Sequence, residues 1–558
     1  MPEKYRPVIG LEIHAELKTK TKMFCDSLND PDEKHPNINV CPVCMGHPGT
    51  LPVANEEAIK KVIKAGLALN CKIAEDTFFE RKNYFYPDLP KGYQITQYQK
   101  PMCYEGYLDI DDPTSPEATK GSKRIRITRI HLEEDAGRLN HAPVPPSQSS
   151  GEARKDYSLV DYNRAGVPLM ELVTEPDFET GLEVRKFAEE LQLIWQYLGV
   201  SEANMEKGEM RVEVNISLMK DDGGLNQSGG LIGRTQRVLG TKAEIKNLNS
   251  IKFAADAVDY EIKRQKEILE DGGEVKQETR GWDENKKATF SQRSKEEAHD
   301  YRYFPEPDLP PIRIANGPAP SELKRGERAS PVAGGPPRAF SIEKLRLELP
   351  ELPQQRRDRF KKLYGLNDAQ VEVFVVARHL GNYYEEVATE LDSAANDYNK
   401  SHELKGAASS EGHALERLHE LAANYIITEF PPLLNMEAGE IDDIEGIKIS
   451  AEAFAELMVL VFHKEVSSTG AKAVLKEMAE TGKHPDGIIK EKDLGQVSDI
   501  GALEVAVVKV IAGNAKAVED YKKGNEAPLK FLIGMVMRET KGKANPQVVE
   551  GMLKNMLK

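Results

Sequence analysis

Two patterns of hydrophobic positions divide this chain of 558 residues. Up to about residue 300, short segments alternate apolar and polar side chains between Gly, Pro, Asn and Asp turns, which is typical of strands in a largely antiparallel sheet. Beyond residue 340 the apolar residues recur every three or four positions, which predicts helices. The pattern therefore predicts an α+β region followed by an all-helical region.

The predicted elements have the following limits. Strands are expected at residues 5–17, 124–134, 166–173, 211–218 and 242–250, with helices between them at 55–70, 181–198 and 251–271. Further helices are expected at residues 341–363, 368–391, 414–428 and 451–464. A final bundle is predicted from helices at residues 498–511, 515–523, 528–540 and 546–557. A Pro- and Gly-rich span at residues 305–337 is the expected link between the two regions.

Composition favours a soluble, globular protein of several domains. Hydrophobic residues make up 39% of the chain and charged residues 30%, and no apolar run approaches the roughly 20 residues that span a bilayer. Only five residues are cysteines, which argues against a disulfide scaffold and for a reducing cytoplasm. The net charge of -15 does not exclude RNA as a partner, because contact with RNA depends on local basic patches.

The first strand carries the first candidate chemistry. Alternation places Leu11 and Ile13 on one face, and Glu12 and His14 on the other. A carboxylate beside an imidazole offers oxygen and nitrogen ligands to a divalent metal. A solvated strand face is the alternative for this segment taken alone.

Later segments repeat this design. Near His131, the adjacent residues Glu133, Glu134 and Asp135 form an acidic run that needs a cation or a basic neighbour. Glu171 lies inside an apolar run, where a carboxylate requires either a metal or an ion-pair partner.

Residues 81–94 mix cations with aromatic rings. Arg81, Lys82 and Lys91 are interleaved with Tyr84 and three further rings, a combination that suits phosphate binding and stacking on a base. Aromatic core residues flanked by surface cations are the alternative. The chain contains no phosphate-binding loop of the Walker type.

Three cysteines suggest part of a zinc site. Cys41 and Cys44 have the Cys-x-x-Cys spacing of half a tetrahedral shell, and Cys25 could supply a third thiolate. A fourth ligand is not evident, although His35 and His47 are available. A redox pair is disfavoured because no strand leads into Cys41.

Five segments in order carry a family resemblance. They read Gly-Leu-Glu-Ile-His-Ala-Glu-Leu at 10–17, Arg-Lys-Asn-Tyr-Phe-Tyr-Pro-Asp at 81–88, His-Leu-Glu-Glu-Asp-Ala-Gly at 131–137, Thr-Lys-Ala-Glu-Ile-Lys-Asn-Leu-Asn-Ser at 241–250 and Asp-Tyr-Arg-Tyr-Phe-Pro-Glu-Pro-Asp at 300–308. Together they resemble the B subunit of aspartyl/glutamyl-tRNA amidotransferases. The helical tail fits as well, so the resemblance covers nearly the whole chain.

The resemblance implies an ATP-dependent ligase that acts on misacylated tRNA in the cytoplasm. The side-chain carboxyl of Glu on tRNA(Gln), or of Asp on tRNA(Asn), is phosphorylated and then amidated by ammonia. An amidase (A) subunit supplies the ammonia, and a small (C) subunit holds the assembly together. The expected domains are a cradle-shaped catalytic domain at residues 1–303, a helical domain at 304–485 and a tRNA-binding helical tail at 486–558.

The resemblance also suggests roles for the candidate residues. Glu12, His14 and Glu171 are expected to hold Mg²⁺ with one of the adjacent pair Glu133 and Glu134, because neighbours in a strand point to opposite faces. Glu134 is the residue chosen.

The remaining roles concern the nucleotide, the acyl phosphate, the zinc and the tRNA. Arg81, Lys82, Tyr84 and Lys91 are expected to bind ATP, and Lys246 is expected to face the acyl phosphate. Zinc occupancy stays open because Ser27 stands where related chains carry a fourth Cys. The expected tRNA contacts in the tail are Lys522, Lys523, Lys530, Arg538, Lys541 and Lys543.

The sequence disfavours two alternatives and leaves open the tRNA substrate and the role of two insertions. An archaeal relative that serves only tRNA(Gln) carries an extra domain, which the span at residues 305–337 is too short to hold. A tRNA-binding scaffold without catalysis would not need the carboxylates named above. The sequence does not choose between Glu-tRNA(Gln) and Asp-tRNA(Asn), and apparent insertions at residues 221–233 and 392–412 have no assigned role.

Overall fold

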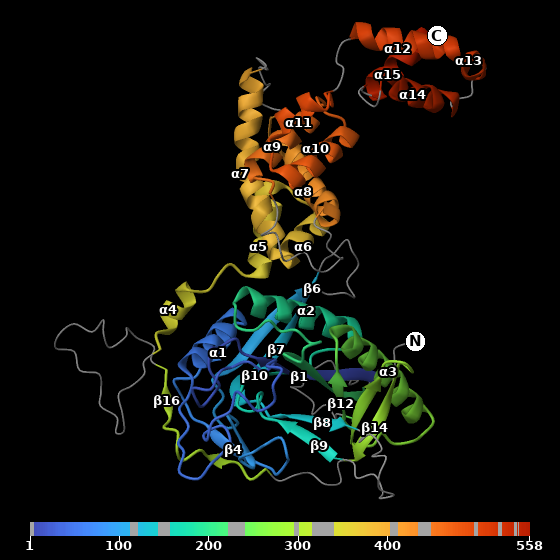
Figure 1. Cartoon of the computed structure of the whole chain (residues 1–558). Helices are drawn as coiled ribbons and strands as arrows, with labels where there is room; N and C mark the ends of the chain where they lie inside the picture. Colours follow the sequence, from blue (N-terminus) through green and yellow to red (C-terminus); the bar gives the residue numbers. More distant parts are fainter. Residues whose placement is uncertain are drawn as a thin grey trace, which may run out of the picture. The chain divides into compact units, whose positions relative to one another are not determined.

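The computed structural model (Figure 1) contains two compact units, Met1–Pro353 and Gln354–Lys558. It describes residues 5–111, 121–142, 157–220, 240–294, 301–314, 340–401, 411–433, 448–495, 500–522, 527–540, 544 and 546–557. The first unit combines a mostly antiparallel sheet with helices, and the second is all-helical, so the predicted fold class is confirmed. The finer division at residues 303 and 485 stays a prediction.

The first unit contains the strands. Their limits are β1 Tyr5–Glu16, β2 Lys72–Ile73, β3 Asp76–Thr77, β4 Glu80–Asn83, β5 Tyr93–Thr96, β6 Cys103–Asp111, β7 Ser122–Glu134, β8 Arg138–Ala142, β9 Tyr157–Asp161, β10 Pro168–Thr174, β11 Met210–Lys220, β12 Ala243–Leu248, β13 Glu278–Asp283, β14 Ala288–Ser294, β15 Phe304–Pro305 and β16 Ile312–Arg313. Its helices are α1 Glu56–Ala68, α2 Gly181–Tyr197, α3 Ile251–Glu270 and α4 Ile342–Leu347.

The second unit is built from helices. Their limits are α5 Pro353–Tyr364, α6 Asp368–Val376, α7 Arg378–Ser401, α8 Glu411–Leu433, α9 Ala451–Phe462, α10 Ser468–Thr481, α11 Pro485–Glu491, α12 Ile500–Gly513, α13 Ala515–Lys522, α14 Ala527–Glu539 and α15 Pro546–Met556. Helices α12, α14 and α15 share an apolar core, as expected for a bundle.

A nine-stranded sheet organises the first unit, in the order β14-β13-β12-β11-β1-β10-β7-β6-β2. Neighbouring strands are antiparallel except β12 and β13, which are parallel and joined through α3. Strand β1 therefore lies at the centre of the sheet, hydrogen-bonded to β10 on one side and β11 on the other. Three smaller sheets, β15-β4-β5, β16-β3 and β8-β9, accompany it.

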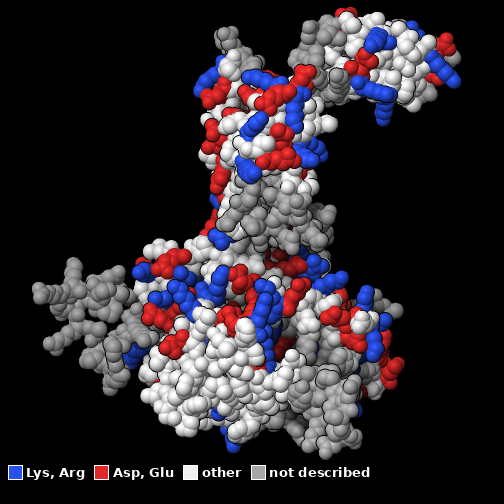
Figure 2. All heavy atoms as spheres, viewed as in Figure 1, with Lys and Arg blue, Asp and Glu red and all other residues white. Residues whose placement is uncertain are grey.

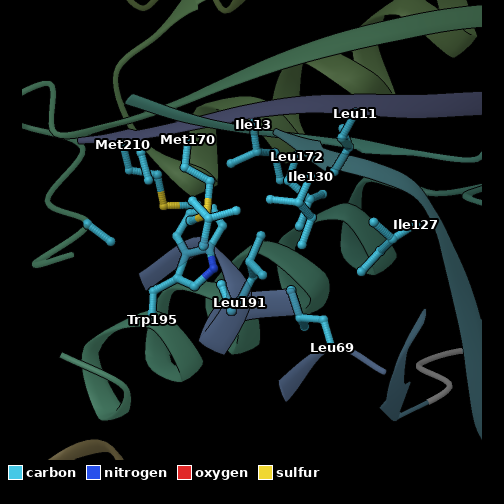
Figure 3. Close-up of a cluster of buried hydrophobic side chains, with 14 of the residues drawn as sticks. Leu11, Ile13, Leu69, Ile127, Ile130, Met170, Leu172, Leu191, Trp195 and Met210 are labelled. Carbon is cyan, nitrogen blue, oxygen red and sulfur yellow. The ribbon is translucent and has the colours of Figure 1, made fainter. Parts of the chain in front are cut away.

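One face of the large sheet is the core. Leu11, Ile13, Ile130 and Leu172 are fully buried, and Figure 3 shows them in one cluster with Met170, Met210 and Trp195 of α2. Full burial of each such side chain stabilises the fold by about 1.5–3 kcal/mol. A one-residue slip of β1 would replace Leu11 and Ile13 in the core with Glu12 and His14, so the apolar pattern fixes the register.

Two predicted helices were wrong in extent. The helix expected at residues 341–363 is two helices, α4 and α5, because Pro350 and Pro353 cannot continue a helix, whereas Pro353 can begin one. The helix expected at 368–391 is also two, α6 and α7, since Ala377 leaves the helical conformation. A Cβ at Gly381 would collide with the carbonyl oxygen of Phe374, so glycine permits α7 to approach the end of α6 closely.

Other differences concern length and coverage. Helix α8 extends beyond the predicted residues 414–428 at both ends, and α10 and α11 were not predicted. Most of the expected link at 305–337, all of the apparent insertion at 221–233 and residues 402–410 of the second insertion lie outside the described residues. Among the helices that the structure describes, none is long and apolar enough to cross a membrane.

Candidate active site

The candidate site lies on the sheet face opposite the core, which we call the polar face. It is formed by Glu12, His14, Arg129, His131, Glu133, Glu171, Glu213, Glu244 and Lys246. Strand β10 pairs with both β1 and β7, so that Glu171 stands opposite His14 on one side and opposite His131 on the other. The register thus gathers residues that are far apart in the sequence.

Two imidazoles and two carboxylates form the His14 cluster, which comprises His14, His131, Glu133 and Glu171. The Nε2 atom of His14 lies 3.3 Å from Glu133 Oε1 and 3.4 Å from Glu171 Oε2. His131 Nε2 lies 3.4 Å from the same Glu171 oxygen, and its buried Nδ1 has no hydrogen-bond partner among the described residues. One imidazole and two carboxylates within 4.8 Å of one another form a donor set suited to a divalent cation.

The structure selects Glu133 rather than Glu134 for this cluster, which corrects the sequence-based choice. Alternation within β7 sends the two side chains apart. Glu134 forms an ion pair with Lys91, and its Oε1 accepts a hydrogen bond of 2.9 Å from the backbone N–H of Ile95. Sequence alone showed that only one of the two could join the cluster, but the strand register was needed to tell which.

The charges of the His14 cluster are strongly coupled. Burial lowers the pKa of His14, but hydrogen bonds to Glu133 and Glu171 outweigh it and hold this pKa well above its ordinary value. Burial would raise the pKa of Glu171, yet the neighbouring His131 and His14 hold it well below its usual range. Burial lowers the pKa of His131. The two carboxylates therefore require positive charge, which His14 supplies here and a bound cation could supply instead.

Glu12 belongs to a second group rather than to the His14 cluster. Its carboxylate lies with those of Glu213 and Glu244 within 4.8 Å, and burial is the main cause that raises its pKa. Lys246 Nζ lies 2.8 Å from Glu213 and 3.4 Å from Glu244. The amide of Asn215 donates a 2.9 Å hydrogen bond to Glu12. The residues expected to form one magnesium site are thus separated: His14 and Glu171 lie in the His14 cluster, Glu12 lies in the second group, and Glu134 lies in neither.

A third charged group lies at the end of β1. Arg211 forms an ion pair with Asp135 and lies 3.5 Å from Glu16, while Arg164 lies 3.5 Å from Asp135. Burial and the adjacent Asp135 raise the pKa of Glu16 to about 8. Neither Glu16 nor Arg211 was among the residues expected to form the site.

The cations expected to bind nucleotide are partly engaged by carboxylates. Arg81 donates hydrogen bonds of 2.7 and 2.8 Å to Glu306 and lies over the Tyr93 ring at 4.2 Å from its centroid. Lys91 is paired with Glu134. The contact of Arg81 joins the segment at 81–94 to the segment at 300–308, and that of Lys91 joins it to the end of β7.

Lys82 differs from these two cations. It has no ion pair among the described residues and lies 5.0 Å from the centroid of Tyr301 and 5.9 Å from that of Tyr84. Tyr84 packs edge-on against Tyr301, and burial raises its pKa.

Aromatic rings stand beside the polar face and were not assigned from the sequence. Tyr98 stacks on Tyr303 at 4.6 Å, and Arg129 lies over Tyr98 while its guanidinium is 3.6 Å from Glu171. Burial, and then the nearby Glu171, raise the pKa of Tyr303. The motif at residues 300–308 was the available signal, because it places two Tyr beside one Arg.

The three predicted zinc ligands lie together. The thiols of Cys25, Cys41 and Cys44 are within 4.8 Å of one another, and all are free. A hydrogen bond from Cys25 lowers the pKa of Cys44 to about 5, so a thiolate is available for a metal. Cys25 and Cys44 line a pocket whose lining also includes His47 and Glu134.

Fold and site together define a class: a catalytic domain with carboxylates and imidazoles on one sheet face, followed by a helical unit. The family description "GatB/GatE catalytic domain" matches residues 7–318, and "GatB domain" matches residues 412–557. The chain belongs to the B-subunit family of the aspartyl/glutamyl-tRNA(Asn/Gln) amidotransferases.

Similar proteins with that name span the whole chain. The B subunit of the Carboxydothermus hydrogenoformans enzyme is 44% identical over 554 residues, which cover 99% of each chain. Those of Caldicellulosiruptor saccharolyticus and Thermotoga maritima are 43% and 41% identical with the same coverage. The predicted family is confirmed.

Proposed function

We propose that this chain is the tRNA-dependent subunit of an amidotransferase, a ligase that uses ATP to convert Glu-tRNA(Gln), Asp-tRNA(Asn) or both to the amide. Family membership over the full length supports the reaction class. The observation that carries the assignment of the site is the His14 cluster, a buried group of carboxylates and imidazoles inside the residues matched by the catalytic-domain family.

The His14 cluster fits a magnesium ion by its donor chemistry. Glu133 and Glu171 supply hard oxygen atoms and His14 a nitrogen, and His131 holds an unpartnered buried Nδ1 beside them, within the described part of the chain. A cation bound there would offset the repulsion between a phosphoryl group and the carboxylate it is transferred to. His131 would orient Glu171 for the ion, since its Nε2 lies 3.4 Å from that carboxylate.

The residues around the cluster supply charge and stacking for the two substrates. Lys82, which faces Tyr84 and Tyr301, is proposed to bind nucleotide phosphate. Arg81 and Lys91 would have to exchange their carboxylate partners to do the same. Lys246 lies between Glu213 and Glu244. It is proposed to contact the acyl phosphate after releasing these carboxylates.

The tail is proposed to bind the tRNA. Lys522, Lys530 and Arg538 are the predicted contacts that the structure describes, whereas Lys523, Lys541 and Lys543 lie outside the described residues. Figure 2 shows that basic and acidic side chains are interspersed on the visible face of the tail, so contact would involve individual cations rather than one basic face.

The partners are proposed from the family. Relatives are named as one lettered component, B, of an amidotransferase, which implies further components. We infer that an amidase (A) subunit supplies the ammonia and that a small (C) subunit belongs to the same assembly. A cytoplasmic location agrees with the free state of all five cysteines.

The test is ATP hydrolysis by the enzyme assembled with its amidase and small partners, with and without Glu-tRNA(Gln) or Asp-tRNA(Asn). We expect hydrolysis that depends on a misacylated tRNA and falls by at least about 100-fold in Glu171→Gln, because that carboxylate lies between both imidazoles. Glu202→Gln is a suitable control, since Glu202 pairs with Lys18 on the surface.

Either of two results would contradict the proposal. Wild-type enzyme that hydrolyses no ATP with either misacylated tRNA would leave a tRNA-binding scaffold. Full activity in Glu171→Gln would remove the His14 cluster from the reaction.

A further inference from the structure

An irregularity in β12 lies beside the polar face. The register between β11 and β12 shifts, so that two residues of β12, Lys246 and Asn247, stand opposite the single residue Glu213. Ile245 and Leu248, on either side, are 0% and 5% exposed and belong to the core. This is a β-bulge, a device that redirects side chains at the point where it occurs.

The bulge changes where Asn247 points. Strict alternation would send it into the core together with Ala243 and Ile245. Instead its side chain is exposed, and Leu248 takes the core position. Asn247 has a φ of 59°, in the left-handed region, and its carboxamide makes no hydrogen bond within the described part of the chain.

Packing of Leu248 accounts for the bulge, but it does not account for an asparagine at position 247. A side chain in the left-handed region is less stable than glycine would be, and Asn is one of the few side chains that tolerates it. The exposed carboxamide of Asn247, next to the charged residue Lys246, is available to bind a ligand. Lys246, its neighbour in the bulge, already contacts Glu213 and Glu244 at 2.8 and 3.4 Å.

We propose that Asn247 binds the aminoacyl group of the misacylated tRNA and positions its side chain for reaction at the His14 cluster. The inference rests on the proposed function and adds a substrate-binding residue to it. A carboxamide both donates and accepts, so it can hydrogen-bond the ester oxygen, the α-ammonium or the ribose hydroxyl of that group.

The position of Asn247 in the sheet agrees with this substrate. Strand β12 is two strands away from β1 in the sheet order, and Asn247 stands level with Glu12, two residues along β1 from His14. The backbones of Asn247 and His14 are therefore about 12 Å apart, a span that a glutamyl ester and its ribose held between two side chains can bridge. The side chains of Asn247 and His14 could therefore contact opposite ends of one aminoacyl group.

Local charge favours the aminoacyl group over the nucleotide. Three carboxylates, Glu12, Glu213 and Glu244, face a single cation, Lys246, in the described group next to Asn247. These carboxylates can attract the α-ammonium of the aminoacyl group, which a nucleotide lacks.

The test compares Asn247→Gly with wild type in the enzyme assembled with its partner subunits. Glycine removes the carboxamide and suits the backbone conformation, so a purely structural Asn247 would lose no activity. We expect instead a higher KM for the misacylated tRNA and a kcat/KM lower by about 10- to 100-fold, with the KM for ATP and the unfolding temperature unchanged.

Two further variants complete the test. Asn70→Gly is the matched control: Asn70 has a φ of 57°, lies after α1, and its amide donates only a 3.4 Å hydrogen bond to the carbonyl of Tyr107. It should retain wild-type kinetics. Asn247→Asp keeps the shape and the tolerance for this backbone but loses the donor, so its kcat/KM should fall at least as far.

The outcomes distinguish this inference from the proposed function. Wild-type kinetics in Asn247→Gly and Asn247→Asp would overturn the inference while leaving the proposed function intact. A rise in the KM for ATP alone would overturn the choice of the aminoacyl group. A wild-type enzyme inactive with both misacylated tRNAs would overturn the proposed function, and the inference with it.

Discussion

We predict that Glu16 makes the first unit less stable as the pH rises, and that Glu16→Gln removes this effect. Glu16 is buried beside Asp135, which raises its pKa from 4.5 to about 8. The unfolded chain releases this proton near pH 4.5, whereas the folded chain keeps it up to about pH 8. The stability that the retained proton confers is therefore fully present below pH 4.5 and is lost as the pH rises through 8.

The magnitude follows from the size of the pKa shift. Each pKa unit corresponds to about 1.4 kcal/mol, so the free energy of unfolding should fall by up to about 5 kcal/mol between about pH 4.5 and about pH 9. The neighbouring charges of Asp135 and of Arg211, which lies 3.5 Å from Glu16, can offset part of this pKa shift. We therefore take about 2 kcal/mol as the lower bound for the fall in the free energy of unfolding. An amide at position 16 can still donate to Asp135 but cannot ionise.

The assay is urea unfolding followed by tryptophan fluorescence at pH 5 and pH 8. The chain has two tryptophans, Trp195 and Trp282, and both are buried in the first unit, so the signal reports that unit alone. The stability of Glu16→Gln relative to wild type should increase by about 2–4 kcal/mol from pH 5 to pH 8. The surface variant Glu202→Gln should show no such change. Parallel pH profiles for Glu16→Gln and wild type would refute the reasoning.

Two further predictions concern metals. Glu133→Gln should weaken Mg²⁺ binding by at least about 100-fold, whereas Glu134→Gln should change it by less than about tenfold, because only Glu133 lies in the His14 cluster. Isothermal titration of the two variants measures this, and equal effects would contradict the assignment of Glu133. Ser27→Cys should tighten zinc binding by on the order of 100-fold, because Ser27 hydrogen-bonds Cys25 beside the other two thiols. Competition with a chromogenic chelator measures the zinc affinity, and an unchanged affinity would contradict this geometry.

The sequence predicted the strands around the site well because their patterns are local. Alternation in β1 and β11 reports which side chains face the core, and the observed limits agree with the expected ones within two residues. The sequence predicted less reliably the helices whose breaks depend on packing against other helices. Pro350 and Pro353 are visible in the sequence, but the break at Ala377 depends on how α7 packs against α6.

Composition and motifs also determined the family, since the motifs that carry the resemblance are contiguous in the sequence. They named Glu12, His14 and Glu171 as polar residues within apolar strands, which is a property of each segment alone. The contacts among these residues are a property of strand order and register, which arise only when distant strands pair.

Tertiary structure decided how the polar residues are grouped. Pairing of β10 with both β1 and β7 placed Glu133 in the His14 cluster and Glu134 against Lys91, and pairing of β1 with β11 drew Glu12 toward Glu213. The bulge that exposes Asn247 also depends on the partner strand. The sequence by itself determined which residues turn away from the core, because alternation is local. Only the folded sheet decided which of them meet, because register is set by the burial of the opposite face.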